Sequence, residues 1–367
     1  MDHSTAIVPG VRKIAVLRAN ALGDLIFTLP ALDALHSTYP GAELVLLGLS
    51  WHHSFFAQRP SPVNRVIVTP IYQGVHDEPG GEENLAEQDA FFTAMKGERF
   101  DLAVQVHGGG RYSNPFVRRL NARMSIGSKS PDAAPLDRWI PYIRYHLEVL
   151  RMLEVVSLAG AKAMNDIEPH IIVTSADLAE SYRIVPETTR PLVTLHPGAT
   201  DQERIWPAER FATVGDAMAA TGAQIVITGT AGERDRVRAV AACMRSDAWE
   251  LAGRLSLNGL TGLLARSQVV VSNDTGPLHL ATAVGTATVG IYWCFNFVTI
   301  GPMTQARHRS AISWRVACPV CGVDRARTSC EHHPSFVADI QAEEVIMSAL
   351  DLLTVEPAQA MRTDTAT

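Results

Sequence analysis

The chain has 367 residues, of which 47% are hydrophobic and 19% charged, and its 38 acidic and 32 basic residues give a formal net charge of −6. At roughly 150 residues per domain this length suits two domains with ordinary folded cores, and the acidic balance argues against a general nucleic-acid binder. No apolar run approaches the roughly 20 residues of a membrane span, and Met1 to Lys13 lacks the apolar core of a signal peptide, so we expect a cytoplasmic location.

Short apolar strands and helices alternate through the first half of the chain. The pattern predicts strands at 13–18, 43–49, 63–69 and 102–106, and helices at 25–35, 89–96 and 142–158. A polar, Gly-rich stretch at 73–89 predicts a surface loop. This alternation is typical of a parallel, doubly wound α/β sheet.

A polar linker is predicted near residues 174–190, and a second α/β pattern follows it. Strands are expected at 191–195, 224–229, 269–271 and 287–292, and helices at 207–220, 233–244, 257–265 and 341–353, with an irregular segment at 293–335. We therefore predict two Rossmann-like domains that face each other across a cleft, 1–185 and 186–340. A C-terminal helix at 341–354 and a disordered tail at 355–367 complete the prediction.

The stretch from Val269 to Gly285 is the most informative part of the sequence. Three valines predict a buried strand, a polar turn follows, and Pro277 is suited to the first position of a helix. The first N–H groups of such a helix are unpaired and its dipole is positive there, so the turn predicts a phosphate site. An ordinary helix cap with a partly buried histidine is the alternative, because such turns are common.

The residues of this turn narrow the choice of ligand. Asp274 would repel a phosphate that it faced, so we expect it to cap the helix or to accept hydrogen bonds from sugar hydroxyls. Thr275 and Gly276 allow a close backbone approach, and His279 lies in the first helical turn, where it can donate to a phosphate oxygen.

Several motifs follow one another in a definite order. They are Gly23-Asp24, Thr28-Leu29-Pro30-Ala31-Leu32, Arg204-Ile205-Trp206-Pro207, Gly232-Glu233, Leu251-Ala252-Gly253, and Ser272-Asn273-Asp274-Thr275-Gly276 with His279. In order and spacing, from about residue 12 to residue 353, the chain resembles the ADP-heptose:lipopolysaccharide heptosyltransferases of glycosyltransferase family 9.

The resemblance implies a GT-B fold and an inverting, metal-independent sugar transfer, with the acceptor in the N-terminal half and the nucleotide-sugar donor in the C-terminal half. Asp24 matches the proposed catalytic base of the family. The positions implied for donor binding are Thr200, Arg204, Glu233, Leu251, Asp274, Thr275, Gly276 and His279. Arg204 would contact the pyrophosphate and Glu233 the ribose.

The chemistry is consistent with these roles. An inverting displacement needs a carboxylate to take the proton of the acceptor hydroxyl. The chain has no D-x-D pair, so Arg204, His279 and the helix N-terminus would stabilise the departing diphosphate. The plainer alternatives are a helix cap for Asp24 and a solvated surface charge for Arg204.

Acceptor contacts are expected from Arg18, Asn20 and Arg111, which lie at strand ends of the N-terminal half and would face the predicted cleft. An anionic core oligosaccharide or a phosphorylated lipid would need such polar and cationic groups. Each of the three has an alternative as a contact within the fold or a solvated charge.

Cys318, Cys321, Cys330 and His332 have a spacing that resembles that of metal ligands, but we favour reduced thiols in a loop, because the transfer needs no metal. A Cys3His structural site is the alternative. Some protein-modifying enzymes similar to the family carry a cysteine-bound iron, so the cluster also bears on the choice of acceptor.

The function we expect is heptose transfer from ADP-heptose to a lipopolysaccharide core acceptor, without a cofactor and with peripheral association at the inner face of the inner membrane. Alternatives are a protein acceptor, another nucleotide sugar, a nucleotide-sugar epimerase, or a binding protein without catalytic activity.

Overall fold

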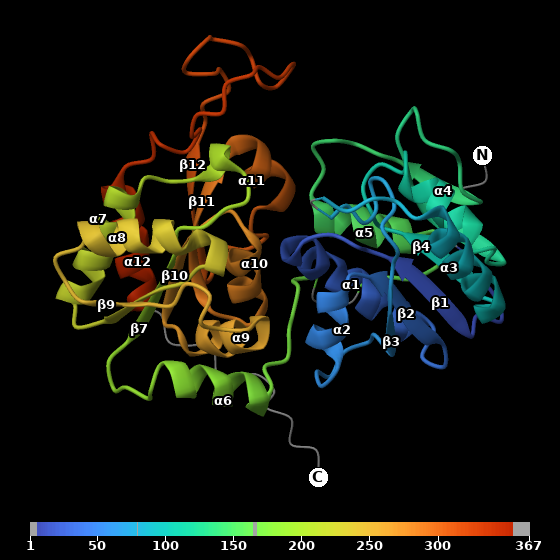
Figure 1. Ribbon diagram of the computed structural model, residues 1–367, viewed down its shortest axis with the longest axis horizontal. Helices are drawn as coiled ribbons and strands as arrows, with labels where there is room; N and C mark the ends of the chain where they lie inside the picture. Colours follow the sequence, from blue (N-terminus) through green and yellow to red (C-terminus); the bar gives the residue numbers. More distant parts are fainter. Residues whose placement is uncertain (1–5, 79, 164–166, 355–367) are drawn as a thin grey trace. The chain divides into compact units, whose positions relative to one another are not determined.

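The computed structural model describes residues 6–78, 80–163 and 167–354. The chain divides into two compact units, Met1–Pro169 and His170–Thr367, which we call the N-terminal and C-terminal units. In each unit, helices cover both faces of a single sheet (Figure 1). This is the α/β architecture of doubly wound domains.

The N-terminal unit is built on a six-stranded sheet in the order β3-β2-β1-β4-β5-β6, and all neighbouring strands are parallel. The strands are β1 (Lys13–Leu17), β2 (Glu43–Gly48), β3 (Arg65–Val68), β4 (Leu102–Gln105), β5 (Met124–Lys129) and β6 (Arg138–Pro141). The helices are α1 (Leu22–Thr38), α2 (Ser50–Phe56), α3 (Leu85–Glu98), α4 (Ser113–Arg119) and α5 (Glu148–Ser157).

Alternate strand residues of this sheet pack on different helices. Ala15 and Leu17 of β1 belong to a core cluster with Phe92 of α3 and Phe116 of α4. Successive side chains of a strand point to opposite faces, so Ile14 and Val16, which are also buried, face the other helical layer. The near-continuous apolar strands therefore reflect a sheet that is covered on both sides.

The C-terminal unit repeats this plan with a second parallel sheet, in the order β12-β11-β10-β7-β8-β9. The strands are β7 (Leu192–His196), β8 (Gln224–Ile227), β9 (Ala248–Glu250), β10 (Val269–Asn273), β11 (Ala287–Trp293) and β12 (His308–Ser313). The helices are α6 (Ser175–Ile184), η1 (Gln202–Arg204), α7 (Ala208–Ala220), η2 (Ala231–Glu233), α8 (Arg234–Cys243), α9 (Leu257–Arg266), α10 (Gly276–Ala283), α11 (Cys294–Ile300) and α12 (Ala342–Leu353).

In both sheets the order in which strands are added reverses at the centre. In the N-terminal unit the change lies between β1 and β4, and in the C-terminal unit between β7 and β10. Ligands of open α/β sheets bind outside the carboxyl ends of the strands at such a switch point. The loops that follow these four strands are therefore the first places to examine for a site.

Most of the predicted elements are confirmed, and the differences lie in polar segments. The expected linker at 174–190 contains α6, and the expected irregular segment at 293–335 contains α11 and β12. The helix expected from residue 142 begins at Glu148. The tail at 355–367 lies outside the described residues.

The units divide between Pro169 and His170, whereas the sequence analysis placed the boundary between residues 185 and 186. The difference is explained by α6, which packs against α9 of the C-terminal unit. Ser256 donates to Glu180, and Arg266 Nη1 donates to Ser181 Oγ at 2.7 Å. A Cβ on Gly262 would lie 2.1 Å from the Asp177 carbonyl, so the two helices approach closely where α9 has a glycine.

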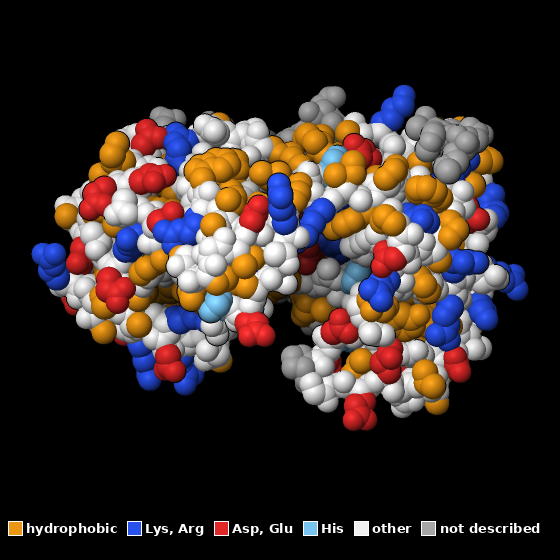
Figure 2. All heavy atoms as spheres, turned by 90° about the horizontal axis from the view of Figure 1, so that it is seen from above, with side chains coloured by type: hydrophobic (Ala, Val, Ile, Leu, Met, Phe, Trp, Pro, Cys, Tyr) orange, Lys and Arg blue, Asp and Glu red, His pale blue; other side chains and the backbone are white. Residues whose placement is uncertain are grey.

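Among the described residues, no helix is long and apolar enough to cross a membrane. On the face shown in Figure 2, basic and acidic side chains are interspersed with apolar ones. This face therefore lacks the single-signed field that nucleic-acid binders use.

Candidate functional site

At the switch point of the N-terminal unit, Arg18 follows β1 and Asp24 lies in the first turn of α1. Arg18 Nη2 donates to Asp24 Oδ1 at 2.7 Å, Nε donates to the Asp24 carbonyl at 3.1 Å, and Nη1 donates to the Val106 carbonyl after β4. The Arg18 side chain is 3% exposed, but that of Asp24 is 35% exposed. Arg18 thus fixes a carboxylate that a substrate can still reach.

Asp24 is not the cap of its helix, which was the plainer alternative for this residue. The N-cap of α1 is Ala21, and Asp24 lies three positions further on. The carboxylate is therefore available for another role, such as accepting a proton from a bound hydroxyl.

Two buried histidines lie near this pair. The Ala19 N–H donates to His107 Nδ1 at 3.2 Å, which leaves His107 Nε2 as the donor to the Gly74 carbonyl. Burial, followed by the nearby Arg18 guanidinium, lowers the pKa of His107 to about 4. Burial also lowers the pKa of His52 to about 4, again with a contribution from Arg18. Both rings are neutral at physiological pH.

The three residues expected to contact an acceptor differ in their surroundings. Arg18 is buried and committed to Asp24 and Val106, which favours a positioning role over the acceptor contact that we expected. Asn20, two residues after Arg18, is partly exposed. Arg111 is 65% exposed and lies 3.7 Å from Asp132, so its guanidinium is accessible to an anionic ligand.

The buried histidines are expected to make the protein sensitive to acid. Burial lowers the pKa of His196 in the C-terminal unit to about 4 as well. Unfolded histidines titrate near 6.5, so between pH 6.5 and 4 the unfolded chain binds protons that the folded chain does not. The free energy of unfolding should therefore fall as the pH drops through this range, by up to about 3 kcal/mol per histidine. Urea unfolding at pH 7.5, 6 and 5 measures the fall.

His52→Asn provides the matched variant for this prediction. The asparagine oxygen can still accept from the Leu49 N–H, which donates to His52 Nδ1 at 2.8 Å in the native chain. The pH slope should become shallower in His52→Asn and stay unchanged in His36→Asn, whose ring is exposed. Equal slopes in His52→Asn and the native protein would contradict the prediction.

At the switch point of the C-terminal unit, Asp274 follows β10 and holds two partners. Arg204 Nη1 donates to Asp274 Oδ2 and to the Asp274 carbonyl, both at 3.1 Å, and His279 Nε2 lies 3.1 Å from Oδ1. The Asp274 side chain is fully buried, whereas that of Arg204 is 21% exposed. An ionised carboxylate is stable at such a position only when it is paired, which is what Arg204 and His279 provide.

This arrangement differs from both roles expected for Asp274. The N-cap of α10 is Thr275, and the Asp274 carboxylate faces Arg204 and His279 instead of the helix. Arg204 is not a solvated surface charge, because it joins this pair. Its Nε is nevertheless buried and has no hydrogen-bond partner among the described residues. A buried donor of this kind is suited to an acceptor from a ligand.

The beginning of α10 adds backbone donors to the same region. Leu278 N–H donates to the Thr275 carbonyl, and Pro277 has no N–H. In the described part of the chain, the N–H groups of Thr275 and Gly276 have no hydrogen-bond partner. They are the donors that a phosphate can use at a helix N-terminus.

The other expected donor-binding residues also follow strands of this sheet. Glu233 closes η2, where its carboxylate accepts from the Thr230 N–H at 2.7 Å. A Cβ on Gly198 would lie 2.1 Å from Glu233 Oε1, so the carboxylate lies directly against the loop after β7. Thr200 is exposed in that loop, and Leu251 is buried after β9. The eight expected donor-binding residues thus lie in the loops and first helical turns that follow β7, β8, β9 and β10.

Sequence reasoning missed two residues that support this edge. Tyr292 is the penultimate residue of β11, and burial together with the nearby Asp274 raises its pKa well above the usual value. Glu203 is buried beside Arg204 and pairs with Arg325, more than a hundred residues further along the chain. A glutamate between two polar residues carries no signal of burial, because its partner is distant in sequence.

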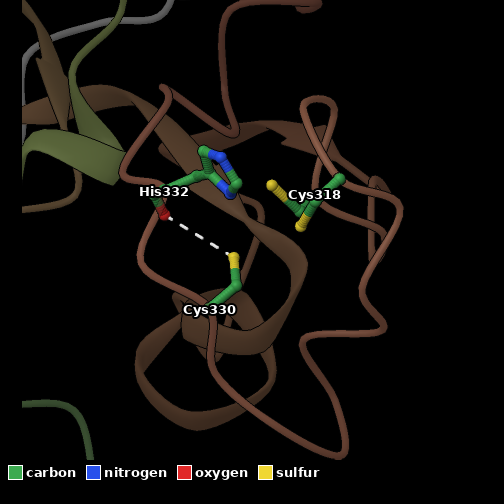
Figure 3. Close-up of side chains that lie close together, drawn as sticks. Cys318, Cys330 and His332 are labelled. Carbon is green, nitrogen blue, oxygen red and sulfur yellow. Dashed lines mark hydrogen bonds between the residues drawn. The ribbon is translucent and has the colours of Figure 1, made fainter.

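The predicted Cys3His cluster is brought together in the loop after β12. One ligand atom from each of Cys318, Cys321, Cys330 and His332 lies within 4.8 Å of the others. Figure 3 shows the side chains of Cys318, Cys330 and His332 converging on a common space. The four residues thus lie close enough to hold a metal, which was the alternative to the reduced thiols that we expected.

The model of glycosyltransferase family 9 (heptosyltransferase) matches residues 89–319, which is more than half of the chain. The chain belongs to this family. It is therefore a glycosyltransferase of the heptosyltransferase type, as the sequence motifs predicted.

Relatives of this family 9 glycosyltransferase match along nearly its whole length. Lipopolysaccharide heptosyltransferase 2 of Salmonella typhimurium is 23% identical over 94% of this chain and 99% of its own. A crystal structure of a family 9 glycosyltransferase from Veillonella parvula has a TM-score of 0.76 at 21% identity, covering 95% of this chain and 99% of that one. The structure of Escherichia coli ADP-heptose lps heptosyltransferase II has a TM-score of 0.72 at 16% identity, covering 93% and 98%. These similarities confirm the predicted GT-B class of two doubly wound units.

Proposed function

We propose that this family 9 glycosyltransferase transfers heptose from ADP-heptose to a lipopolysaccharide core acceptor, with inversion at the sugar carbon. The donor and acceptor follow the names of its relatives. The observation that carries the proposal is the Arg204–Asp274–His279 group at the switch point of the C-terminal unit. It places an arginine with an unsatisfied buried donor beside two unpaired helix N–H groups, which is an arrangement suited to a diphosphate.

In the proposed reaction Asp24 is the general base. Its partly exposed carboxylate takes the proton of an acceptor hydroxyl while the hydroxyl oxygen attacks the anomeric carbon and the bond to the diphosphate breaks. Arg18 holds the carboxylate in position through a charge-assisted hydrogen bond. Because His107 is neutral, Arg18 provides the positive charge beside Asp24 without a second one from the histidine.

The departing diphosphate gains negative charge as the bond breaks. Arg204 and the first N–H groups of α10 would stabilise that charge, and His279 would assist them. Asp274 acts indirectly, because its buried carboxylate orients Arg204 and His279. With these groups, and with no D-x-D pair in the sequence, we propose that the transfer itself uses no metal. A metal at the cysteine cluster would be structural, because four protein ligands close a tetrahedral site.

The acceptor determines where the enzyme works. A lipid-linked core oligosaccharide would bring it to the cytoplasmic face of the inner membrane as a peripheral protein. We assign the contact with an anionic acceptor to Arg111, which is exposed beside Tyr112 in the N-terminal unit. This role for Arg111 rests on its charge and exposure.

Nucleotide preference tests the donor half of the proposal. Because a ligand that binds only the folded state stabilises it by RT ln(1 + [L]/Kd), ADP at about 100 times its Kd should add about 2.7 kcal/mol. The melting temperature should therefore rise with ADP and much less with UDP or GDP at the same concentration. An equal rise with all three nucleotides would count against an adenine nucleotide as the donor.

Product analysis tests the acceptor half. Incubation with ADP-heptose and a heptose-deficient lipopolysaccharide core should yield ADP and a heptosylated core with the opposite anomeric configuration. Transfer only to a protein would favour a protein acceptor, and release of an altered nucleotide sugar without acceptor would favour an epimerase. ADP-heptose binding without any product would favour a binding protein.

A further inference from the structure

The loop after β12 begins with a tight turn that brings two thiols together. Cys318 N–H donates to the Val323 carbonyl and Gly322 N–H donates to the Cys318 carbonyl, both at 2.8 Å. Gly322 has a φ of +75°, which a residue with a side chain rarely adopts. The turn therefore places Cys318 and Cys321 at adjacent corners, as C-x2-C metal sites require.

Two further ligands reach the same space from the following residues. Cys330 and His332 complete a set whose ligand atoms lie within 4.8 Å of one another. Three sulfurs and one imidazole nitrogen at this separation suit a tetrahedral divalent cation, with Zn–S bonds of about 2.3 Å and Zn–N bonds of about 2.0 Å. Thiolate-rich tetrahedral sites select zinc or iron over magnesium or calcium.

We propose that Cys318, Cys321, Cys330 and His332 bind one structural zinc or iron ion. We further propose that the loop held by this ion, residues 318–332, positions Arg204 of the donor site through Glu203. The second half of the proposal rests on the proposed function. The metal site itself is independent of that function.

The connection to the donor site runs through Arg325, which lies between Cys321 and Cys330. Arg325 Nη1 lies 3.4 Å from Cys330 Sγ and donates to the His332 carbonyl at 3.3 Å. Its Nη2 donates to both oxygens of Glu203, at 2.9 and 3.1 Å. One guanidinium therefore contacts both the ligand set and a buried carboxylate of the donor-site loop.

Glu203 receives additional contacts from the end of the cysteine loop. His333 Nδ1 lies 3.1 Å from Glu203 Oε1, and Phe336 N–H donates to the Glu203 carbonyl at 2.8 Å. Glu203 and Arg204 are neighbours in the single turn of η1, so the position of one determines the position of the other. Arg204 then reaches Asp274.

Loss of the metal should loosen this connection. Residues 318–332 lie outside helices and strands, so few backbone hydrogen bonds fix their conformation. A bound cation would link the four ligands and hold this segment in one conformation. Without the cation, Cys330 and His332 would no longer be held in place, and Arg325, which contacts both, would become more mobile. The hydrogen bonds from Arg325 to Glu203 would then be weaker. We therefore expect weaker donor binding with little change in the chemical step.

Metal content tests the site directly. Protein purified under reducing conditions should contain about one zinc or iron atom per chain by mass spectrometry of metals. Cys321→Ser and Cys330→Ser should lose it, whereas Cys243→Ser, an exposed cysteine in α8, should keep it. Native protein that remains without metal after exposure to Zn²⁺ or Fe²⁺ under reducing conditions would overturn the site. Thiols that form a disulfide in air but bind no metal when they are reduced would also overturn the site.

Donor affinity tests the connection. Removal of the metal from native protein by a chelator should raise the Kd for ADP about tenfold, and addition of Zn²⁺ should restore it, which separates the effect from misfolding. Glu203→Gln should keep the metal and show a similar rise in the KM for the donor with kcat nearly unchanged. Unchanged ADP affinity in both cases would overturn the connection. Native protein that holds metal but never binds ADP would instead refute the proposed function.

Discussion

Replacement of Asp24 by asparagine is expected to lower kcat by about 10²- to 10⁴-fold, which is the usual contribution of a general base. Asparagine has nearly the same shape and can still accept a hydrogen bond from Arg18 Nη2, but it cannot take a proton. The Kd for ADP should stay within about twofold of the native value, because the donor residues lie in the other unit. Single-turnover rates and nucleotide binding, measured on the same preparation, separate the two effects.

Asp235→Asn is the matched control for this experiment. Asp235 lies in the first turn of α8, as Asp24 does in α1, but it is exposed and follows η2. Its replacement removes the same favourable interaction with a helix dipole, worth about 0.3–1 kcal/mol. If Asp24→Asn loses no more activity than Asp235→Asn, Asp24 supports its helix and is not the base.

Arg204→Gln is expected to raise the Kd for ADP about 10- to 100-fold, because hydrogen bonds to charged groups contribute about 1.5–3 kcal/mol. The change also leaves the buried Asp274 with His279 as its remaining side-chain partner among the described contacts. Removal of one member of a buried pair costs about 3–5 kcal/mol, so the free energy of unfolding should fall as well. Calorimetric titration with ADP and urea unfolding give the two quantities.

A double variant distinguishes the two consequences of this substitution. Arg204→Gln combined with Asp274→Asn removes the unpaired carboxylate, so much of the lost stability should return while the ADP affinity stays low. Arg238→Gln, at an exposed position of α8, should change neither quantity. Recovery of ADP affinity in the double variant would show that Arg204 serves only to neutralise Asp274.

The fold was predictable from sequence wherever strands are apolar on both faces. Strands β1, β2, β10 and β11 were all expected, because their buried positions read as continuous apolar runs. β12, with the sequence HRSAIS, and the short β6 and β9 were missed, since they are edge strands that are covered less completely. The interior strand β5 was missed as well, because its sequence, MSIGSK, has no continuous apolar run. α6 was taken for a linker because its residues are mostly polar. Its capping box, Thr174 with Asp177, was the available signal.

The candidate site was predictable in its residues more than in its contacts. The turn at Asp274 and the position of Arg204 were both identified from motifs, but their pairing joins residues 70 positions apart. Local patterns carry no information on such a contact, because it arises from the order of strands in the sheet. The same reason applies to Arg18, whose burial depends on the approach of the β4 loop.

The two units each contain an arginine–aspartate pair at the centre of the sheet edge, but with opposite polarity. In the N-terminal unit the cation is enclosed and the anion meets the solvent, and in the C-terminal unit the anion is enclosed and the cation meets the solvent. One shared architecture thus exposes an anionic group in one unit and a cationic group in the other, as the proposed base and the proposed diphosphate site require. If the Arg and Asp of one pair were exchanged, the net charge of the protein would stay the same. That unit would, however, expose a group of the opposite charge and attract a ligand of the wrong sign.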